Sequence, residues 1–419
     1  MTDHPDLHGP ESWFFGNASA PDVPYAFNEE GWLVRASGLA SVERVAHMGG
    51  RPLSGRWADA GRSVVFADVL RGLMRFDPAS GTVEALASAT CDGAPVLYVD
   101  DVRVLAGGDV VFSSASAHSP LWRGTAGPGP GRAEQDAPVR LELIAGGRGS
   151  GRLMLLRAQR DSGIASAPLR NAAGLTAFEP CPALLLDGLH FANGVALAPA
   201  DEDLPPGVPY RRWAGENTRG GETAPPVDVL VTATFGDAVS RVSLPADRAA
   251  APVVTRAWST SFPALLDNVS PGPGGTWLVA LPTARSLSLH AMWASRALRW
   301  VVSRLPWALW PAAEPFGGVL QLDASGRQIR SWVDLSGRAL PFVTSATWVD
   351  CDVVLGGGGG TEGGVVQSLC AGRAPGHGVM LLGSLKTPGL SVLHVPPGAQ
   401  AKADGPESRS PSGPADDEL

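Results

Sequence analysis

The chain alternates short apolar stretches with turn residues over most of its length. Segment 72–84 predicts a β-hairpin, because two stretches of alternating inward and outward residues flank a turn that contains Asp77-Pro78 and Gly81. Segment 318–329 repeats this pattern. Weaker copies follow the same scheme, at 31–38, 238–244 and 390–395.

Repeats of about 40–50 residues, each a small antiparallel sheet, are typical of a β-propeller. We count six repeats. The sequence therefore predicts an all-β fold, a six-bladed β-propeller over residues 9–396, followed by a polar tail at 397–419 that we expect to be disordered. A β-sandwich would explain the strands but not the recurring hairpin.

Segment 285–311 departs from the strand pattern and predicts a helical insertion. It is basic and rich in Trp, and its side chains recur at helical spacing, at Trp293, Ala297, Trp300 and Arg304. We favour a lid that packs over the mouth of the propeller. A basic, Trp-rich helix can also lie on a membrane surface, and the two interpretations are compatible.

Composition narrows the class of protein. The 52 Gly and 37 Pro residues among 419 favour many turns over long helices. A net charge of −8 gives no global attraction to nucleic acid, so we expect no nucleic-acid partner. The sequence has no run of about 18 apolar residues that would predict a membrane span. Its first residues are polar, unlike a signal peptide, and leave the compartment open.

Four cysteines are present, at positions 91, 181, 351 and 370. None belongs to a Cys-x-x-Cys pair, which disfavours a cysteine-rich zinc site. The sequence does not establish which cysteines are bridged. A Cys351–Cys370 bridge is favoured, because it would close a glycine-rich loop.

Short acidic or amide side chains stand before several strand-like runs. Asn193 precedes one such run, the pair Asp267-Asn268 another, and Asp100 a third, while Glu11 lies near the start of the chain. In a radial repeat these oxygen-bearing turns would converge on the central axis and could hold a hard cation such as Ca²⁺ or another divalent ion. The alternative is that Asn193 and Asn268 only cap turns.

The chain resembles the strictosidine synthase-like proteins, a propeller family that includes the adipocyte plasma membrane-associated proteins. Four motifs carry the resemblance, which covers most of residues 9–396: Phe191-Ala192-Asn193-Gly194-Val195-Ala196-Leu197, Phe262-Pro263-Ala264-Leu265-Leu266-Asp267-Asn268-Val269, Val279-Ala280-Leu281-Pro282-Thr283 and Leu382-Gly383-Ser384. The wider superfamily is similar to paraoxonases and gluconolactonases, which are calcium-dependent hydrolases of esters and lactones. Relatives are often membrane-anchored or secretory.

The resemblance implies a small-molecule ester or lactone as substrate and a metal on the propeller axis. Carried over motif by motif, the implied ligands are Glu11, Asp100, Asn193, Asp267 and Asn268. Asp100 stands where relatives often have an amide, and calcium accepts either kind of oxygen.

In this interpretation the cation polarises an ester or lactone carbonyl and stabilises the oxyanion as water adds. Three residues are candidates for the base that activates water: Asp267 from the metal cluster, His190 and His118. The sequence lacks a Gly-x-Ser-x-Gly elbow, which disfavours a serine esterase.

Two other functions are weighed against hydrolysis. One is a non-catalytic propeller that binds a ligand or partner around a structural metal. The other is the carbon–nitrogen condensation of the plant strictosidine synthases, which resemblance links to a catalytic Glu late in the propeller. The matching stretch here, 343–350, contains no Glu.

Overall fold

The computed structural model of the chain describes residues 7, 9–16, 23–38, 41–105, 107–117, 149–161, 164–199, 227–236, 238–245, 247–248, 250–259, 262, 264–306, 309, 315–352, 365–384 and 390–396. Two of the predictions above, the candidate base His118 and the tail at 397–419, lie outside these residues.

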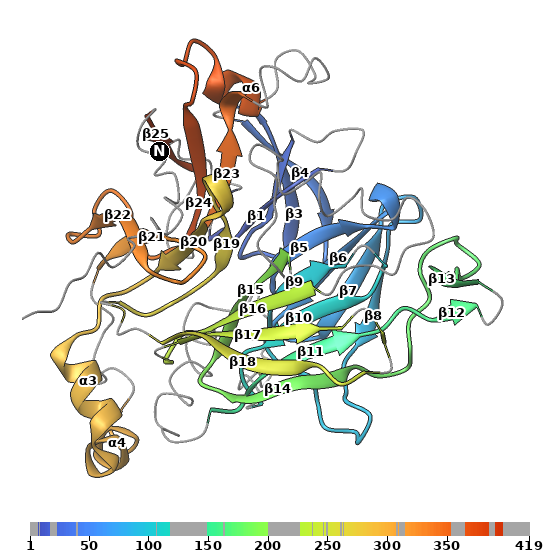
Figure 1. Cartoon of the computed structure of the whole chain (residues 1–419), viewed down its shortest axis with the longest axis horizontal. Helices are drawn as coiled ribbons and strands as arrows, with labels where there is room; N and C mark the ends of the chain where they lie inside the picture. Colours follow the sequence, from blue (N-terminus) through green and yellow to red (C-terminus); the bar gives the residue numbers. More distant parts are fainter. Residues whose placement is uncertain are drawn as a thin grey trace, which may run out of the picture.

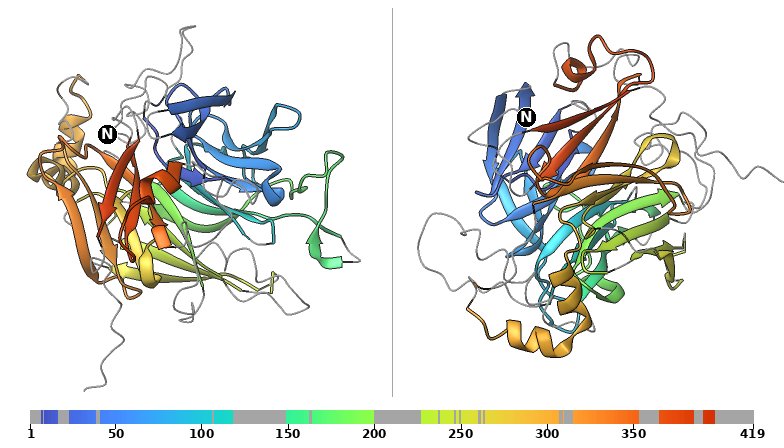
Figure 2. Two further views of the ribbon diagram at one scale, coloured as in Figure 1. Left: turned by 90° about the horizontal axis from the view of Figure 1, so that it is seen from above. Right: turned by 90° about the vertical axis from the view of Figure 1, so that its left-hand side faces the viewer.

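The protein is a six-bladed β-propeller, in which six antiparallel sheets follow one another along the chain (Figures 1 and 2). Blade 1 contains β1 (Trp13–Phe15), β2 (Pro24–Phe27), β3 (Trp32–Gly38) and β4 (Ser41–His47). Blade 2 contains β5 (Pro52–Ala58), β6 (Ser63–Asp68), β7 (Gly72–Asp77) and β8 (Thr82–Ala87). Blade 3 contains β9 (Val99–Val104), β10 (Val110–Ser114), β11 (Gly151–Leu156) and β14 (Ala183–Leu189), with the separate hairpin β12 (Arg160–Asp161) and β13 (Ile164–Pro168) inserted.

The second half of the chain forms the other three blades. Blade 4 contains β15 (Ala192–Pro199), β16 (Val227–Ala233), β17 (Ala238–Leu244) and β18 (Val253–Ser259). Blade 5 contains β19 (Val269–Pro271), β20 (Trp277–Leu281), β21 (Gly317–Leu322) and β22 (Gln328–Asp334). Blade 6 has the three strands β23 (Val343–Asp350), β24 (Gly378–Ser384) and β25 (Ser391–Val395). The hairpins predicted at 72–84 and 318–329 are confirmed as β7–β8 and β21–β22.

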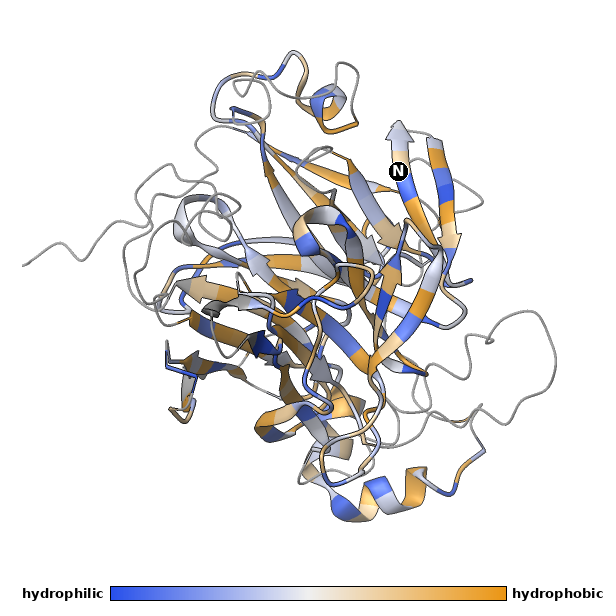
Figure 3. Cartoon of the chain, turned by 90° about the vertical axis from the view of Figure 1, so that its right-hand side faces the viewer, coloured by the Kyte–Doolittle hydropathy of each residue, from blue (hydrophilic) through white to orange (hydrophobic). Residues whose placement is uncertain are grey.

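The first strand of every blade faces the centre. These strands contact one another in the cyclic order β1, β5, β9, β15, β19 and β23, and β23 returns to β1. Apolar side chains fill the spaces between adjacent sheets, as where Val111 and Leu153 of blade 3 pack with Val195 and Val229 of blade 4. Figure 3 shows hydrophobic residues along the strands of the blades. The core is therefore a set of layers between blades, and the polar residues that begin the innermost strands are brought together.

Residues 10–13 close the propeller against blade 6. The indole Nε1 of Trp13 donates to the Leu382 carbonyl at 3.2 Å, and the Ser384 amide donates to the Pro10 carbonyl at 2.7 Å. At Gly383 a Cβ atom would lie 2.0 Å from the Glu11 carbonyl oxygen, so only glycine permits this approach. Closure thus fixes the backbone of Glu11.

The prediction of a single helix in segment 285–311 is wrong, because the helical segment is interrupted. Among the residues described in this segment, α3 (Leu287–Ala294) and α4 (Arg296–Val302) are separate helices that meet at Ser295. The Ser295 hydroxyl accepts a hydrogen bond from the Leu298 amide at 3.2 Å and caps α4, so the chain bends where helical periodicity alone predicts continuation. A further described helix, α6 (Val365–Cys370), lies in the glycine-rich region near the C-terminus and was not predicted.

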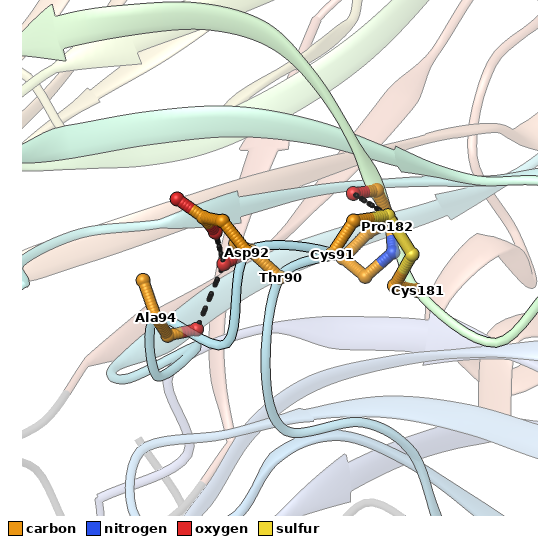
Figure 4. Close-up of a disulfide and its surroundings, with 6 residues drawn as sticks. All are labelled: Thr90, Cys91, Asp92, Ala94, Cys181 and Pro182. Carbon is orange, nitrogen blue, oxygen red and sulfur yellow. Dashed lines mark hydrogen bonds between the residues drawn. A yellow bond between two sulfur atoms is a disulfide. The ribbon is translucent and has the colours of Figure 1, made fainter.

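Two disulfides connect the four cysteines. The expected Cys351–Cys370 bridge is present and holds α6 beside the end of β23. A second bridge, Cys91–Cys181, joins the turn after β8 to the start of β14 (Figure 4). Its cysteines are 90 residues apart in the sequence. The described helices include none with the length and hydropathy to cross a bilayer.

The closure contacts predict a difference between two neighbouring threonines. Thr344 Oγ1 donates to the buried Glu11 carbonyl at 2.8 Å, and the partly exposed Thr347 Oγ1 donates to the Trp13 carbonyl at 3.2 Å. We expect Thr344→Val to lower the free energy of unfolding by about 1–3 kcal/mol, because it leaves a buried acceptor unpaired. Thr347→Val should cost less, because water can replace its hydroxyl. Urea unfolding of both variants tests this, and equal losses would contradict it.

Candidate metal centre

Bulges at the start of two innermost strands place two of the predicted ligands, Asp100 and Asn193. In β9, Asp100 and Asp101 together lie opposite the single residue Ser113 of β10. In β15, Asn193 and Gly194 lie opposite Thr232 of β16 in the same way. A bulge bends its strand and re-aims its side chains. Asp100 and Asn193 are therefore members of strands, and not turn residues that precede them as the sequence suggested.

Gly194 has a reason to be glycine other than a turn. Its φ is not among the positive values, so Asn193-Gly194 is not a left-handed turn. A Cβ at this position would lie 2.4 Å from the Asn268 Cα and 2.6 Å from the Val269 nitrogen. The missing side chain lets blade 4 approach blade 5, and this brings the two predicted asparagines close together.

The five predicted ligands are all buried. Their exposed fractions are 3% for Glu11, 2% for Asp100, 3% for Asn193, 5% for Asp267 and 5% for Asn268. The carboxyl groups of Glu11 and Asp100 interact with each other, and both interact electrostatically with Asp267. The Asn193 amide and the Asn268 side chain both contact the Asp267 carboxyl group. The structure thus brings together residues from four separate blades.

Burial disfavours the ionised form of all three carboxyl groups in this set. Burial raises the pKa of Glu11 to about 7, although Arg51 opposes the shift. Burial also raises the pKa of Asp100 well above its usual range, and the charges of Glu11 and Asp267 raise it further. The pKa of Asp267 is raised well above its usual range by burial and by Glu11. Such a cluster takes up protons or a cation, because several unpaired negative charges are very unfavourable out of water.

Hydrogen bonds donated by the amide nitrogens fix the orientation of both asparagines. The Asn193 Nδ2 donates to Thr234 Oγ1 at 3.1 Å. The Asn268 Nδ2 donates to the Thr344 carbonyl at 3.0 Å and to Asp267 Oδ1 at 3.2 Å. Both amide oxygens are then left without a donor. The buried oxygens of the set that have no hydrogen-bond partner are Glu11 Oε2, Asp100 Oδ1, Asn193 Oδ1 and Asn268 Oδ1.

Buried polar atoms almost always find a partner, so four unpartnered oxygens in one set require an explanation. Carboxylate and amide oxygens are the ligands that calcium takes. Within the described residues no group of three or more His, Cys, Asp or Glu side chains is placed to hold a metal by itself. The set consequently fits an oxygen-binding cation only if the amides of Asn193 and Asn268 take part, and it lacks the imidazole and thiolate donors that favour zinc.

Asp101 has a different role from its neighbour Asp100. Its Oδ1 accepts from Ser54 at 2.6 Å and from Arg103 at 2.7 Å, and its Oδ2 accepts from the Val195 amide at 2.9 Å. Burial opposes ionisation, but Arg103, Arg56 and these donors hold the pKa of Asp101 below its usual range. Asp101 is thus a charged, fully bonded link between blades 2, 3 and 4.

Side-chain donors tie each blade to the next at the level of the candidate ligands. A hydroxyl group of one blade donates to a residue at the start of the following innermost strand. The pairs are Ser12 to Leu53, Ser54 to Asp101, Ser113 to Asn193 and Thr232 to Asp267. Asn268 continues the series to Thr344, and Thr344 donates to Glu11 of blade 1. We call this closed circuit the axial ring.

An apolar layer lies next to the ligands. We define the mouth cluster as the buried residues Leu53, Val69, Tyr98, Ala115, Phe191, Phe235 and Leu265. Tyr98, Phe191 and Leu265 each stand two residues before a candidate ligand. Tyr98 and Phe191 have φ angles of 46° and 63°, a left-handed conformation that costs bulky residues about 1–3 kcal/mol and is concentrated at functional sites.

The helical insertion contacts this mouth cluster. Leu289 and Trp293 of α3 pack against it, and the Trp293 ring lies 5.8 Å from the Phe235 ring. The candidate base His190 lies here too, with its ring 5.1 Å from that of Trp293. His190 is thus placed at the contact between blade 4 and α3. Local sequence patterns do not reveal the mouth cluster, because its residues come from four blades.

Comparison with known proteins adds distant similarities. No family model and no curated protein matches the chain. A solved structure named as a candidate gluconolactonase has 12% identity and a TM-score of 0.47, over 93% of this chain and 94% of the other. A gluconolactonase from Xanthomonas campestris has 13% identity and a TM-score of 0.45, over 82% and 81%. PorZ, a surface component of the type-IX secretion system of Porphyromonas gingivalis, has 10% identity and a TM-score of 0.39, over 90% of this chain and 38% of its own. The propeller assignment rests on the sheets of this chain.

Proposed function

We propose that the protein is a divalent-cation-dependent hydrolase of lactones or esters, with calcium as the preferred ion. The observation that carries the proposal is the set of four buried oxygens without hydrogen-bond partners, on Glu11, Asp100, Asn193 and Asn268. Together with Asp267 they would hold the ion. When bound, such an ion polarises a substrate carbonyl and stabilises the negative charge that develops on its oxygen.

The residues of the chain supply the remaining functions. The axial ring holds the donor oxygens in place before any ligand arrives, which lowers the cost of binding. The mouth cluster offers an apolar surface to the acyl or ring portion of a substrate and excludes water. Asp267 and His190 are the described candidates for accepting the proton of the attacking water, from inside the ligand set and from the mouth respectively.

A non-catalytic propeller with a structural ion is the second candidate. The observation that favours it is the composition of the ligand set, in which the described residues include no histidine. In this case the ion would serve mainly to compensate the three buried carboxylates. The two functions differ in turnover and agree in cation binding, so binding and activity are best measured separately.

Cation binding should depend on Asn193 and not on asparagine content in general. Asn193→Leu removes an unpartnered buried oxygen, and we expect calcium affinity to fall by about tenfold or more. Asn171→Leu is the matched control, because Asn171 Oδ1 already accepts from the Ala173 and Leu175 amides in a turn. Calorimetric titration of chelator-treated protein measures both. Equal affinities in the two variants would return Asn193 to a purely structural role.

The metal-free protein should lose stability as pH rises. The pKa of Glu11 is raised in the folded state from 4.5 to about 7, so the folded protein binds this proton more tightly than the unfolded chain does. This contribution is complete below pH 4.5 and is lost as pH rises through about 7. Calcium requires the ionised carboxylates and should abolish the loss. Urea unfolding at pH 5 and pH 8, with chelator and with calcium, measures whether the free energy of unfolding falls as pH rises. In the presence of chelator, Glu11→Gln should make the free energy of unfolding less dependent on pH. A free energy of unfolding that does not change with pH in the presence of chelator would contradict the prediction.

Hydrolysis should separate the candidate bases. Asp267→Asn should reduce both calcium affinity and turnover of phenyl acetate and simple lactones. His190→Gln should leave affinity unchanged and lower kcat, by about 10²–10⁴-fold if His190 is the base. His290→Gln, at an exposed position of α3, is the control. Calcium binding without turnover of any substrate by the unaltered protein would favour the structural-ion function over hydrolysis.

A further inference from the structure

The helical insertion presents an apolar face that the rest of the described structure leaves uncovered. Trp300 is 58% exposed and Val301 47% exposed, both on α4, while Leu287 at the start of α3 is 89% exposed. On α4 and in the turn that follows it, exposed residues recur at positions 297, 300, 301 and 304, the spacing of one helix face. Leu305 and Leu309, which follow α4, are also exposed. Figures 1 and 2 show α3 and α4 projecting from the sheets.

The charge of this segment is opposite to that of the whole protein. Residues 285–313 contain four Arg and no acidic residue, whereas the net charge of the chain is −8. Arg304 lies over the Trp300 ring, with its Cζ 3.9 Å from the ring centroid, so the apolar and basic groups form one surface. Arg296 is exposed at the start of α4. Apolar and aromatic groups beside arginine are the composition that binds an anionic bilayer surface.

The opposite side of the insertion is anchored to the propeller. Leu289 and Trp293 pack against the mouth cluster, and Arg285 donates to the Gly236 and Ala264 carbonyls at 3.2 and 3.4 Å. Arg299 donates to the Met292 and Trp293 carbonyls at 3.1 and 2.6 Å, which holds α4 against the end of α3. The exposed face is therefore held in a defined position relative to the mouth of the propeller.

We propose that the outer face of α3 and α4 docks on the surface of a bilayer that contains anionic lipid. The occupant follows from charge and shape together: an apolar, Trp-containing face with basic and no acidic groups complements negative headgroups over an acyl layer. Docking would place the mouth cluster beside the bilayer. The inference concerns surface binding alone and holds whether or not the centre binds a cation.

Flotation with vesicles tests the proposal on the whole protein. We expect binding to phosphatidylcholine vesicles that contain phosphatidylglycerol, and weaker binding as salt rises. Trp300→Ser with Leu305→Ser should lower the partition coefficient roughly tenfold or more, because each change removes buried apolar area at the interface. Arg296→Gln with Arg304→Gln should remove most of the preference for anionic vesicles.

The matched control is Val45→Ser with Leu184→Ser, two residues 45% and 52% exposed on β4 and β14 of the propeller. This variant should bind as the unaltered protein does. No binding to vesicles with or without phosphatidylglycerol would overturn the proposal. An equal loss of vesicle binding in this control and in the variant with Trp300→Ser and Leu305→Ser would also overturn it. A second copy of the chain is the alternative occupant of this face, and light scattering tests for it. A dimer that Trp300→Ser dissociates would show that a second copy covers the face and would overturn the bilayer proposal.

Discussion

The structure depends on the charge balance of three carboxyl groups that are almost completely buried. Glu11, Asp100 and Asp267 come from three different blades and interact with one another. The buried guanidinium of Arg51 offsets part of this charge, and its nitrogens donate to the carbonyls of Gly9, Asn28 and Pro52. One cation cannot balance three anions, so the folded state favours proton uptake or a further positive ion. That requirement explains why the innermost residues, rather than the blades around them, determine what the propeller can bind.

Asp100 and Asp101 show how strongly local partners decide the fate of a buried charge. Both are almost fully buried and adjacent in one bulge, yet their pKa values move in opposite directions. Asp101 has donors from three blades, whereas one oxygen of Asp100 has none. The donors around Asp101 stabilise its ionised form, so Asp101 is a structural charge. Asp100 keeps a buried oxygen that has no partner. Asp101 belongs to the axial ring through the hydrogen bond from Ser54, and Asp100 does not.

The sequence was most informative where its pattern is local. Alternation around Asp77-Pro78 and Gly81 predicts the β7–β8 hairpin because neighbouring residues make that hairpin. Asn193 and Asp267-Asn268 could be found because short polar groups interrupt apolar runs. The bulges could not, since the sequence does not show whether Asp100 or Asp101 points to the centre. The Cys91–Cys181 bridge and the mouth cluster depend on contacts between blades, beyond the reach of local periodicity. The break at Ser295 did have a signal, because serine is a good helix N-cap.

The mouth cluster changes what the polar centre can do. Aromatic rings form a chain from Tyr98 through Phe191 and Phe235 to Trp293, with successive centroids 5.1, 6.0 and 5.8 Å apart. An apolar layer next to buried charges lowers the local dielectric constant, so a carbonyl held there interacts more strongly with a cation than it would in water. The same layer is mostly apolar, so it attracts apolar groups more strongly than a free sugar or other highly hydroxylated molecule. If the centre hydrolyses lactones or esters as proposed, this layer would favour substrates with an apolar ring or acyl chain, and α3 would take part in selecting them, because Leu289 and Trp293 extend the layer.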